Sequence, residues 1–333
     1  MKIRVGTFNL FQFVEPPYSW YTKKEKFNIE QWEEKTTWIK NQISEMNCDI
    51  IGFQEVFSKK ALKTLLGELG FKYFKTIDSP KSDKKNDKVF TSTIVGLASK
   101  YPIRNLKRIE IDFTALKKHH LDGFFKFARA PIKATIALPN QKDLDVYVCH
   151  LKSNRDNEFE YVFTKNSTLA EKKEKVKKSL EDNYSQSLKQ RLCEASSIFS
   201  DIKRTANPAV LMTDLNDKEF SITIEALTNQ RYHDDSLKKD DYLLLDAYYF
   251  FKEKIYNPHP EQKEIKRTPT SYFAGKGNIL DYIFVSSLFD KNRKNSIGKI
   301  TSYEVFDKHL QKNQNGSLLN SDHAQVVCEL EIL

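Results

Sequence analysis

The sequence predicts an α/β fold in which β-sheets pack against each other and helices cover them. Twelve short runs rich in β-branched and aromatic residues, each bounded by turn residues, predict strands. Several of these runs are almost continuously apolar, which is typical of strands that are covered on both faces. Three other stretches have the apolar spacing of helices, and these would supply the covering layers.

The predicted strands are spread over the whole chain, from the first residues to the last. They span residues 3–10, 49–55, 71–77, 91–99, 103–111, 132–138, 144–151, 209–215, 243–250, 280–286, 300–306 and 325–332.

The first two helices are short and well delimited. One is predicted over about 30–46, where four apolar residues between Trp32 and Met46 fall on one stripe. The other spans 58–69, because Ser58 is a good N-cap residue and a glycine follows the last apolar position.

The third helix is predicted to be long, from about 167 to 202, within a lysine-rich segment of about 165–203. Its apolar residues recur mostly at every fourth position, and its lysines fall mainly on other faces. Those lysines form either a solvated face or a nucleic-acid contact surface, and the sequence leaves both interpretations open.

The length and composition fit one domain. The chain has 333 residues, of which 39% are hydrophobic, and it contains no linker rich in proline, glycine or serine. We therefore expect a single domain over 1–333.

The four cysteines are far apart and match no paired metal-ligand spacing, so we expect buried thiols rather than disulfides. The first residues form a strand pattern instead of a signal peptide, and no 18 apolar residues run together. We expect a cytoplasmic protein with no membrane span.

The net charge of +9, from 54 lysines and arginines against 45 acidic residues, favours polyanionic partners. A lysine-rich overall composition would give the same excess without a functional basic face. Both explanations fit the composition.

Short polar clusters follow or precede the strand-like runs, as if aimed at one point. They are Thr7-Phe8-Asn9, Gln54-Glu55, Cys149-His150, Asp214-Leu215-Asn216, Leu280-Asp281-Tyr282 and Ser321-Asp322-His323. Carboxylates, amides and two histidines without cysteine are the ligand chemistry of a hard divalent cation. This combination indicates metal-assisted attack on a phosphate.

Glu55 ends a strand and is the predicted metal ligand, with Asn9 and Asp322 completing a sparse shell of the kind that Mg²⁺ prefers. Asp214 is the candidate base that orients or deprotonates a water, and Asn216 lies two residues further on.

His150 and His323 are the two histidines at strand ends. An imidazole can hydrogen-bond a phosphate oxygen or relay a proton when a carboxylate fixes its tautomer, and Asp281 is the candidate for that carboxylate beside His323. Taken singly, each cluster also fits a structural role, such as a turn, an N-cap or a surface pair. Their conjunction and order favour function.

The set of motifs resembles the endonuclease/exonuclease/phosphatase superfamily, the fold of deoxyribonuclease I and of the abasic-site endonucleases. The resemblance runs from Thr7-Phe8-Asn9 to Ser321-Asp322-His323 and so spans nearly the whole chain. It implies a four-layer α/β sandwich, with two packed, mostly antiparallel sheets flanked by helices.

The resemblance also implies roles for single residues. Glu55 would be the principal metal ligand, with Asn9 and Asp322 beside it, for Mg²⁺ or Mn²⁺. Asp214 would activate the water.

For the remaining positions, the resemblance makes Asn216 a transition-state contact and His150 a phosphate contact, and it pairs Asp281 with His323. Arg129, in Phe127-Ala128-Arg129-Ala130-Pro131, resembles an arginine that some members direct toward the scissile phosphate.

Three stretches resemble bacterial nucleases of the predicted extracellular type. They begin at Arg129, His150 and Asp214, and the second continues into Lys152 and Ser153, which would supply phosphate-facing donors. The chain departs from the pattern at Thr213, where a glycine is usual. It also lacks a clear Tyr-x-Glu element between 90 and 99, so the sequence does not show what supports His150.

We therefore expect a monomeric, divalent-metal-dependent phosphodiesterase, a nuclease that hydrolyses DNA by in-line attack of an activated water. Two alternatives remain. One is a phosphatase or phosphodiesterase acting on inositol phosphates, lipids or nucleotides, and the other is a catalytically silent member that binds nucleic acid.

Overall fold

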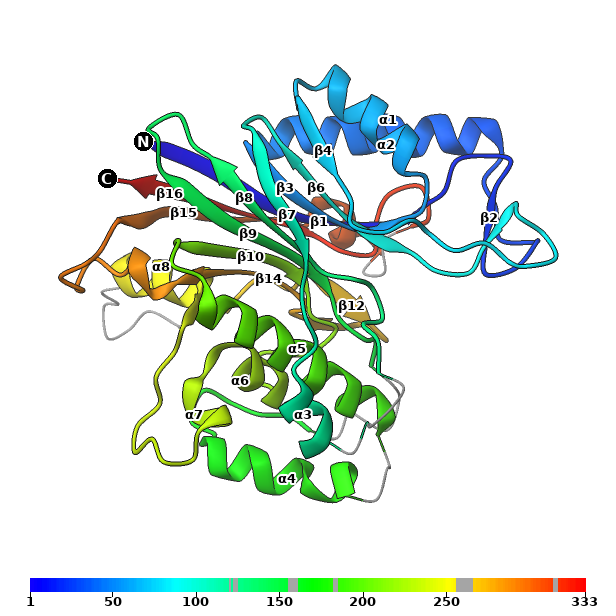
Figure 1. Cartoon of the computed structure of the whole chain (residues 1–333). Coiled ribbons are helices and arrows are strands. Elements are labelled where there is room, and N and C mark those ends of the chain that lie inside the picture. Colours follow the sequence, from blue (N-terminus) through cyan, green and yellow to red (C-terminus); the bar gives the residue numbers. More distant parts are fainter. Residues whose placement is uncertain (120, 122–124, 155–160, 182–184, 256–265, 314–316) are drawn as a thin grey trace.

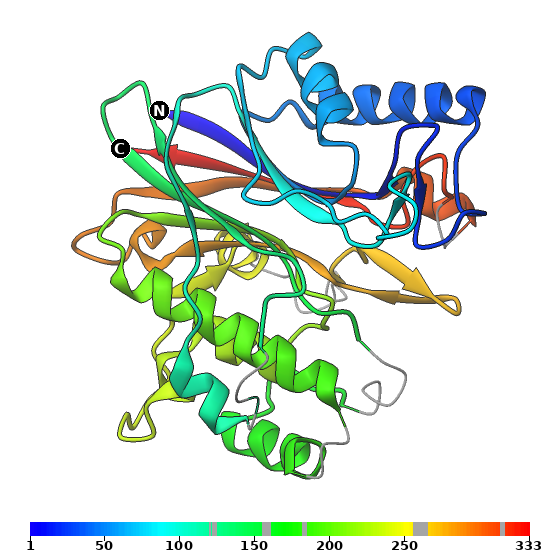
Figure 2. The ribbon, with the colours of Figure 1, turned by 45° about the vertical axis from the view of Figure 1, so that its right-hand side comes forward.

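Two six-stranded sheets pack face to face in the computed structural model of the chain, which describes all residues except 120, 122–124, 155–160, 182–184, 256–265 and 314–316 (Figure 1). Helices lie outside both sheets, so that four layers follow one another (Figure 2). The predicted α/β sandwich is confirmed.

The first sheet has the strand order β15-β16-β1-β3-β6-β4. Its strands are β1 (Lys2–Phe13), β3 (Ile50–Val56), β4 (Tyr73–Lys75), β6 (Ile94–Ser99), β15 (Gly298–Phe306) and β16 (Gln325–Ile332). All neighbours pair antiparallel except β1 and β3, which are parallel.

The second sheet has the order β11-β14-β10-β9-β8-β7. Its strands are β7 (Ile103–Arg108), β8 (Ile132–Ala137), β9 (Asp143–His150), β10 (Ala209–Asp214), β11 (Leu244–Asp246) and β14 (Asp281–Ser286). Here, too, one pair is parallel, β9 with β10, and the others are antiparallel.

Two small pairs of strands lie at the end of the sandwich opposite the two termini (Figure 1). They are β2 (Ser19–Trp20) with β5 (Val89–Phe90), and β12 (Ser271–Phe273) with β13 (Lys276–Asn278). The sequence analysis did not predict β2, β12 or β13.

The outer face of the first sheet is covered by α1 (Ile29–Met46) and α2 (Lys59–Glu68). The helices on the second sheet are α3 (Phe113–Lys118), α4 (Leu169–Glu181), α5 (Gln186–Arg204), α6 (Ile222–Thr228) and α7 (Gln230–His233). Shorter segments complete the chain: α8 (Ala247–Ile255), the 3-10 turn Ser287–Phe289 and α9 (Lys308–Asn313).

α1 begins and ends where its sequence allows the backbone groups to be satisfied. Asn28 and Gln31 form a reciprocal capping box, and Asn47 ends the helix in the left-handed conformation. α2 begins after Ser58 as predicted, but the Ser58 hydroxyl accepts a hydrogen bond from the Glu15 amide at 2.8 Å instead of capping the helix.

Between the two sheets lies a core of alternating side chains. Val5 of β1 and Ile50 of β3 meet Val148 of β9 and Met212 of β10, all buried. The sheets come so close at Gly52 that an added Cβ would lie 2.9 Å from the Met212 Cβ atom. The alternation that builds this core decides which polar side chains face inward at the strand ends.

Two predicted elements differ in the structure. The run 243–250 is a strand only over Leu244–Asp246 and then turns into α8, because the Asp246 carboxylate accepts a hydrogen bond from the Tyr248 amide at 3.0 Å and so starts a helix. The lysine-rich segment contains two helices, α4 and α5, and Ser185 caps the second by accepting a hydrogen bond from the Leu188 amide.

The four cysteines are buried and carry free thiols, as expected. Among the described helices, none has the length and apolar character needed to cross a bilayer.

Candidate active site

The polar clusters meet at one end of the sandwich because of the two parallel strand pairs. Parallel neighbours finish at the same edge of a sheet, so Asn9 of β1 lies beside Gln54 of β3, and His150 of β9 lies beside Asp214 of β10. β14 runs antiparallel to β10 and begins at this edge, which places Asp281 opposite Asp214.

These side chains continue the inward-facing positions of their strands. In β10, Val210 and Met212 point into the core between the sheets, and Asp214 is the next residue on that face. His150 occupies the same place after Val146 and Val148 in β9. The site is therefore the polar end of the core between the two sheets.

Bulges in β1 and β3 redirect the remaining groups. The β1–β3 register shifts after Asn9, and the β3–β6 register shifts before Val56. Glu55 has a φ of 58° and Gln12 a φ of 62°, both in the left-handed region. The Gln12 amide donates to the Glu55 carboxylate at 3.0 Å, so the two distortions are joined. Backbone strain of this kind often accompanies functional sites.

Asp214 is at the centre of the cluster. Its Oδ2 atom accepts a hydrogen bond from the Asn9 amide at 3.0 Å and lies 3.3 Å from His150 Nε2 and 4.0 Å from His323 Nε2. Its Oδ1 atom accepts the Asn216 backbone amide at 2.9 Å. Burial raises the pKa of Asp214 to about 6, against the opposing effect of His323.

His323 and Asp281 form a buried pair, with 2.8 Å between His323 Nδ1 and Asp281 Oδ2. Although burial acts against a charged imidazole, the carboxylates of Asp281, Asp322 and Asp214 hold the pKa of His323 well above its usual range. The pKa of His150 is depressed well below its usual range, by burial and by the Arg129 and His323 charges. The two histidines thus differ in charge at neutral pH.

Backbone anchors hold Asp281 and His323 in place. The Thr270 hydroxyl accepts the amides of Leu280 and Asp281 at 2.9 and 3.1 Å. The Ser321 hydroxyl donates to the Asn9 carbonyl at 2.8 Å and accepts the His323 amide at 3.0 Å. These bonds tie three separate segments of the chain to the same edge.

Asn216 and Arg129 both reach the end of β9. Asn216 Nδ2 donates to the Leu151 carbonyl at 3.1 Å, and an Arg129 guanidinium nitrogen donates to the same oxygen at 3.0 Å. Asn216 itself has a φ of 51°. The support for His150 that the sequence left open comes from Asp214, since no described residue hydrogen-bonds His150 Nδ1.

Two groups of residues have the chemistry of a cation site. Asp214, Asp281 and His323 offer ligand atoms that lie within 4.8 Å of one another. Glu55 and Asp322 form the other group: burial raises the pKa of each carboxyl, and the Asp322 charge adds to the effect on Glu55. Asp322 Oδ1 is buried without a hydrogen-bond partner among the described residues.

The second group fits a divalent cation better. In the first, the Asp281 oxygen is already used by His323 Nδ1, and that bond would have to break. Glu55 is partly exposed and can be reached from outside. An orphaned carboxylate oxygen beside a second carboxylate is a donor set that a hard cation satisfies. The Asn9 carbonyl oxygen accepts only the Phe11 amide, at 3.0 Å, and keeps a second lone pair.

Lys152 and Ser153 lie directly after β9, half-buried. The Lys152 amide donates to Glu194 of α5 at 2.8 Å. Glu194 also accepts the Ala128 amide at 2.7 Å, so it joins the segment before β8 to the segment after β9. The sequence analysis missed Glu194, because its place among the apolar positions of α5 shows no local signal.

Lys35 is a second missed residue. It lies in α1 on the apolar stripe between Trp32 and Ile39, and it is fully buried. Its amine donates to the carbonyls of Leu318 and Asn320 at 2.7 and 2.9 Å, in the segment that leads to Ser321. A lysine at a core position of an amphipathic helix was the signal that could have revealed it.

The comparison with protein families gives one match. Residues 6–294 match the profile described as the Endonuclease/Exonuclease/phosphatase family. Among curated proteins, none matches the chain.

Solved structures with the same fold include three with functional descriptions. The human Nocturnin catalytic domain with bound sulfate shares 16% identity over 100% of this chain and 94% of its own, with a TM-score of 0.59. Danio rerio (printed as D. rerio) TDP2 complexed with single strand DNA product shares 10% over 99% of each chain, with a TM-score of 0.54. An AP endonuclease from Archaeoglobus fulgidus shares 13% over 98% of each, with a TM-score of 0.53. At these identities the likeness concerns the fold.

Proposed function

Because the chain belongs to the endonuclease/exonuclease/phosphatase family, whose members are hydrolases of phosphate esters, we propose that it is a divalent-metal-dependent nuclease that hydrolyses phosphodiester bonds of DNA. One observation carries the proposal: Asn9, His150 and His323, from three separate segments, converge on a single oxygen of Asp214 at the end of the inter-sheet core.

Asp214 acts as the base in this proposal. A carboxylate with a pKa of about 6 is deprotonated at neutral pH and still takes up a proton readily, which suits a group that activates water. The Asn9 amide fixes one Asp214 oxygen and the Asn216 backbone amide fixes the other, so the carboxylate is held in one orientation. In-line attack needs that orientation.

His323 and His150 take different roles because their charges differ. Asp281 keeps His323 protonated, so its Nε2–H can donate to a phosphoryl oxygen and stabilise the charge that develops there. Neutral His150 contacts the phosphate as a hydrogen-bonding group. Arg129 and the Asn216 side chain lie at the same strand end and add donors on that side.

Glu55 and Asp322, with Asn9 beside them, would hold the cation, with Mg²⁺ as the expected ion and Mn²⁺ as a substitute. A divalent ion bound there would neutralise charge on the phosphoryl group. Lys152 and Ser153 would contact the neighbouring phosphate.

DNA is the proposed substrate because a net charge of +9 favours a polyanion. Support also comes from similar structures, whose descriptions name an AP endonuclease and a TDP2 with single strand DNA product. The motif pattern of bacterial extracellular-type nucleases points the same way.

The test compares Asp214→Asn with Asp145→Asn on supercoiled plasmid in Mg²⁺. Asp145 is a buried carboxylate in β9, at the opposite end of that strand from His150, and so controls for the loss of a buried charge in the same sheet. We expect Asp214→Asn to reduce turnover by about 10²–10⁴-fold, as loss of a general base does, and Asp145→Asn to retain it.

The same assay on a phosphoinositide panel separates substrates. Turnover of the phosphoinositides alone would replace the nuclease by a lipid or inositol phosphatase. Binding of DNA with no product under any divalent ion would make the chain a catalytically silent member.

A further inference from the structure

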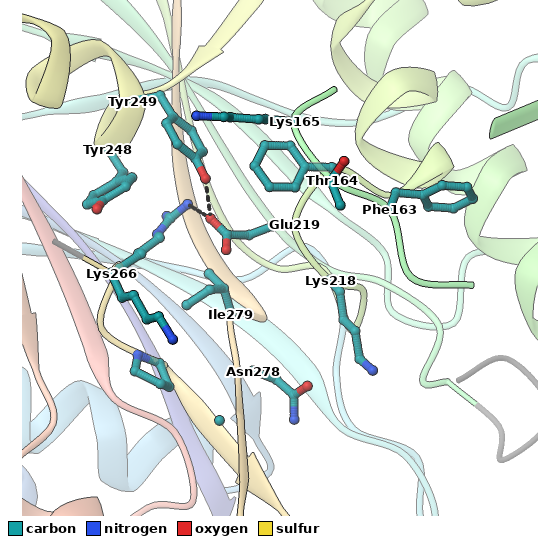
Figure 3. A pocket seen from close by; sticks show the side chains of 14 residues that line it. Phe163, Thr164, Lys165, Lys218, Glu219, Tyr248, Tyr249, Lys266, Asn278 and Ile279 are labelled. Atoms are coloured by element: carbon teal, nitrogen blue, oxygen red, sulfur yellow. Dashed lines mark hydrogen bonds and ion pairs between the residues drawn. The ribbon is translucent and has the colours of Figure 1, made fainter. Parts of the chain in front are cut away.

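A cavity of about 550 Å³ lies beside the catalytic cluster, outside the groups described above. Its wall includes Phe163, Lys165, Lys218, Phe220, Tyr249 and Lys266 (Figure 3). This volume is typical of a site for one small organic group rather than for a protein surface.

Two stretches of its wall are continuous with the catalytic strand ends. Lys218 comes two residues after Asn216, and Asn278 comes three residues before Asp281. The Leu215 amide donates to the Leu280 carbonyl at 2.9 Å, which holds the two stretches together. A ligand part that enters this cavity is therefore adjacent to the proposed scissile phosphate.

The cavity has an excess of positive charge. Arg267 in the wall is balanced by Asp246 at 2.7 Å and by Glu219 at 3.1 Å. Glu219, the single acidic residue among the lining groups, also accepts the Tyr249 hydroxyl at 2.8 Å. The charges of Lys165, Lys218 and Lys266 are in addition to this balanced set, and Figure 3 shows Lys218 and Lys266 extending toward the Asn278 side of the cavity.

The aromatic part of the wall is held in a strained conformation. Phe220 has a φ of 62°, in the left-handed region that a bulky side chain rarely adopts. Its ring lies 5.6 Å from the Tyr249 ring. Strain at a residue that lines a cavity often serves to place a side chain for a ligand.

We propose that this cavity, defined here as the base pocket, binds one unpaired nucleobase of the substrate while its lysines bind the phosphate of the same nucleotide. Aromatic faces stack on any base, and lysines beside them bind the backbone, which is how single-stranded nucleic acid is held without sequence preference. A cavity of this size takes one base and not a base pair. The proposal rests on the nuclease function proposed above and names its substrate as single-stranded or locally opened nucleic acid.

Phe220→Leu tests the stacking. Leucine removes the aromatic face but meets the same backbone strain at a φ of 62°, so the variant is matched for folding. The probes are a fluorescein-labelled single-stranded DNA decamer and a base-free deoxyribose-phosphate decamer of equal length. Both are measured by anisotropy in Mg²⁺ with Asp214→Asn as the parent protein.

We expect the parent to bind the DNA decamer about tenfold more tightly than the base-free decamer, and Phe220→Leu to reduce that preference to about twofold, as loss of one stacked base predicts. The double variant Lys165→Ala/Lys266→Ala should weaken both decamers and lower the salt dependence of binding. Lys294→Ala, an exposed lysine near the start of β15, is the matched control.

Unchanged base preference in Phe220→Leu, or no binding of either decamer by the parent, would overturn the base pocket. The two proposals fail separately. If the wild-type protein cuts DNA but Phe220 and the lysines have no effect, the pocket falls alone. If it cuts no DNA but loses base preference in Phe220→Leu, the nuclease function falls and the pocket stands.

Discussion

Lys35 gives a direct link between pH and stability. Burial lowers the pKa of Lys35 to about 7, while the unfolded chain has an ordinary lysine near 10.5, and the nearby Asp322 and Glu55 charges only partly oppose the effect. Between these pH values the unfolded state binds a proton that the folded state has lost. The free energy of unfolding therefore rises with pH from about 7 to about 10, by up to about 1.4 kcal/mol per pH unit.

Lys35→Met removes this contribution. Methionine fills a similar volume among the rings of Phe11 and Phe27, which lie 6.0 and 5.4 Å from the Lys35 amine. It cannot donate to the carbonyls of Leu318 and Asn320, so the variant should lose about 1–3 kcal/mol at pH 9, where the wild-type amine is mostly neutral. At pH 6 the difference should be smaller, because the wild-type protein then carries a buried charge.

Urea unfolding at pH 6, 7, 8 and 9 measures both effects. The control, Lys63→Met, removes a charge from the exposed face of α2, where burial imposes no cost, and should follow the wild-type curve. Parallel curves for Lys35→Met and the wild type from pH 6 to 9 would refute the assignment of a depressed lysine pKa.

Three other substitutions act on the packing and support of the site. Gly52→Ala places a methyl group 2.9 Å from the Met212 Cβ atom, where the sheets are closest, and should lower the free energy of unfolding in urea by about 1–3 kcal/mol. Glu194→Gln leaves one of two backbone amides unpaired and should cost about 1–3 kcal/mol in the same assay. Asp281→Asn removes the charge beside His323 and should reduce the initial rate of plasmid hydrolysis by about 10²–10⁴-fold. Wild-type values in any of these assays would contradict the contact concerned.

Alternation along the strands made much of the site predictable. His150 and Asp214 each follow two apolar residues on the same face of a strand, so their inward direction can be read from the sequence. The Asp281–His323 contact was expected, and the two atoms lie 2.8 Å apart. Strand positions and the sheet-on-sheet core follow from apolar patterns of the same kind.

The parts that escaped prediction depend on contacts between distant segments. Glu55 leaves the alternation through a bulge, and its φ of 58° has no sequence signature because glutamate has no preference for that conformation. Lys35 meets Leu318 and Asn320 across nearly three hundred residues. The run 243–250 was assigned to a strand because its aromatic residues fit either element, and only the Asp246 cap decides for a helix.

The most direct test of the proposed site is the dependence of hydrolysis on Mg²⁺ in the wild type and in Glu55→Gln. Hydrolysis of DNA by the wild type should stop in excess chelator and return when Mg²⁺ is added. In Glu55→Gln, the Mg²⁺ concentration for half-maximal rate should rise by at least about tenfold, because one of two carboxylates at the cation site is lost. Hydrolysis that persists in chelator, or an unchanged Mg²⁺ titration in Glu55→Gln, would contradict a divalent cation held by Glu55 and Asp322.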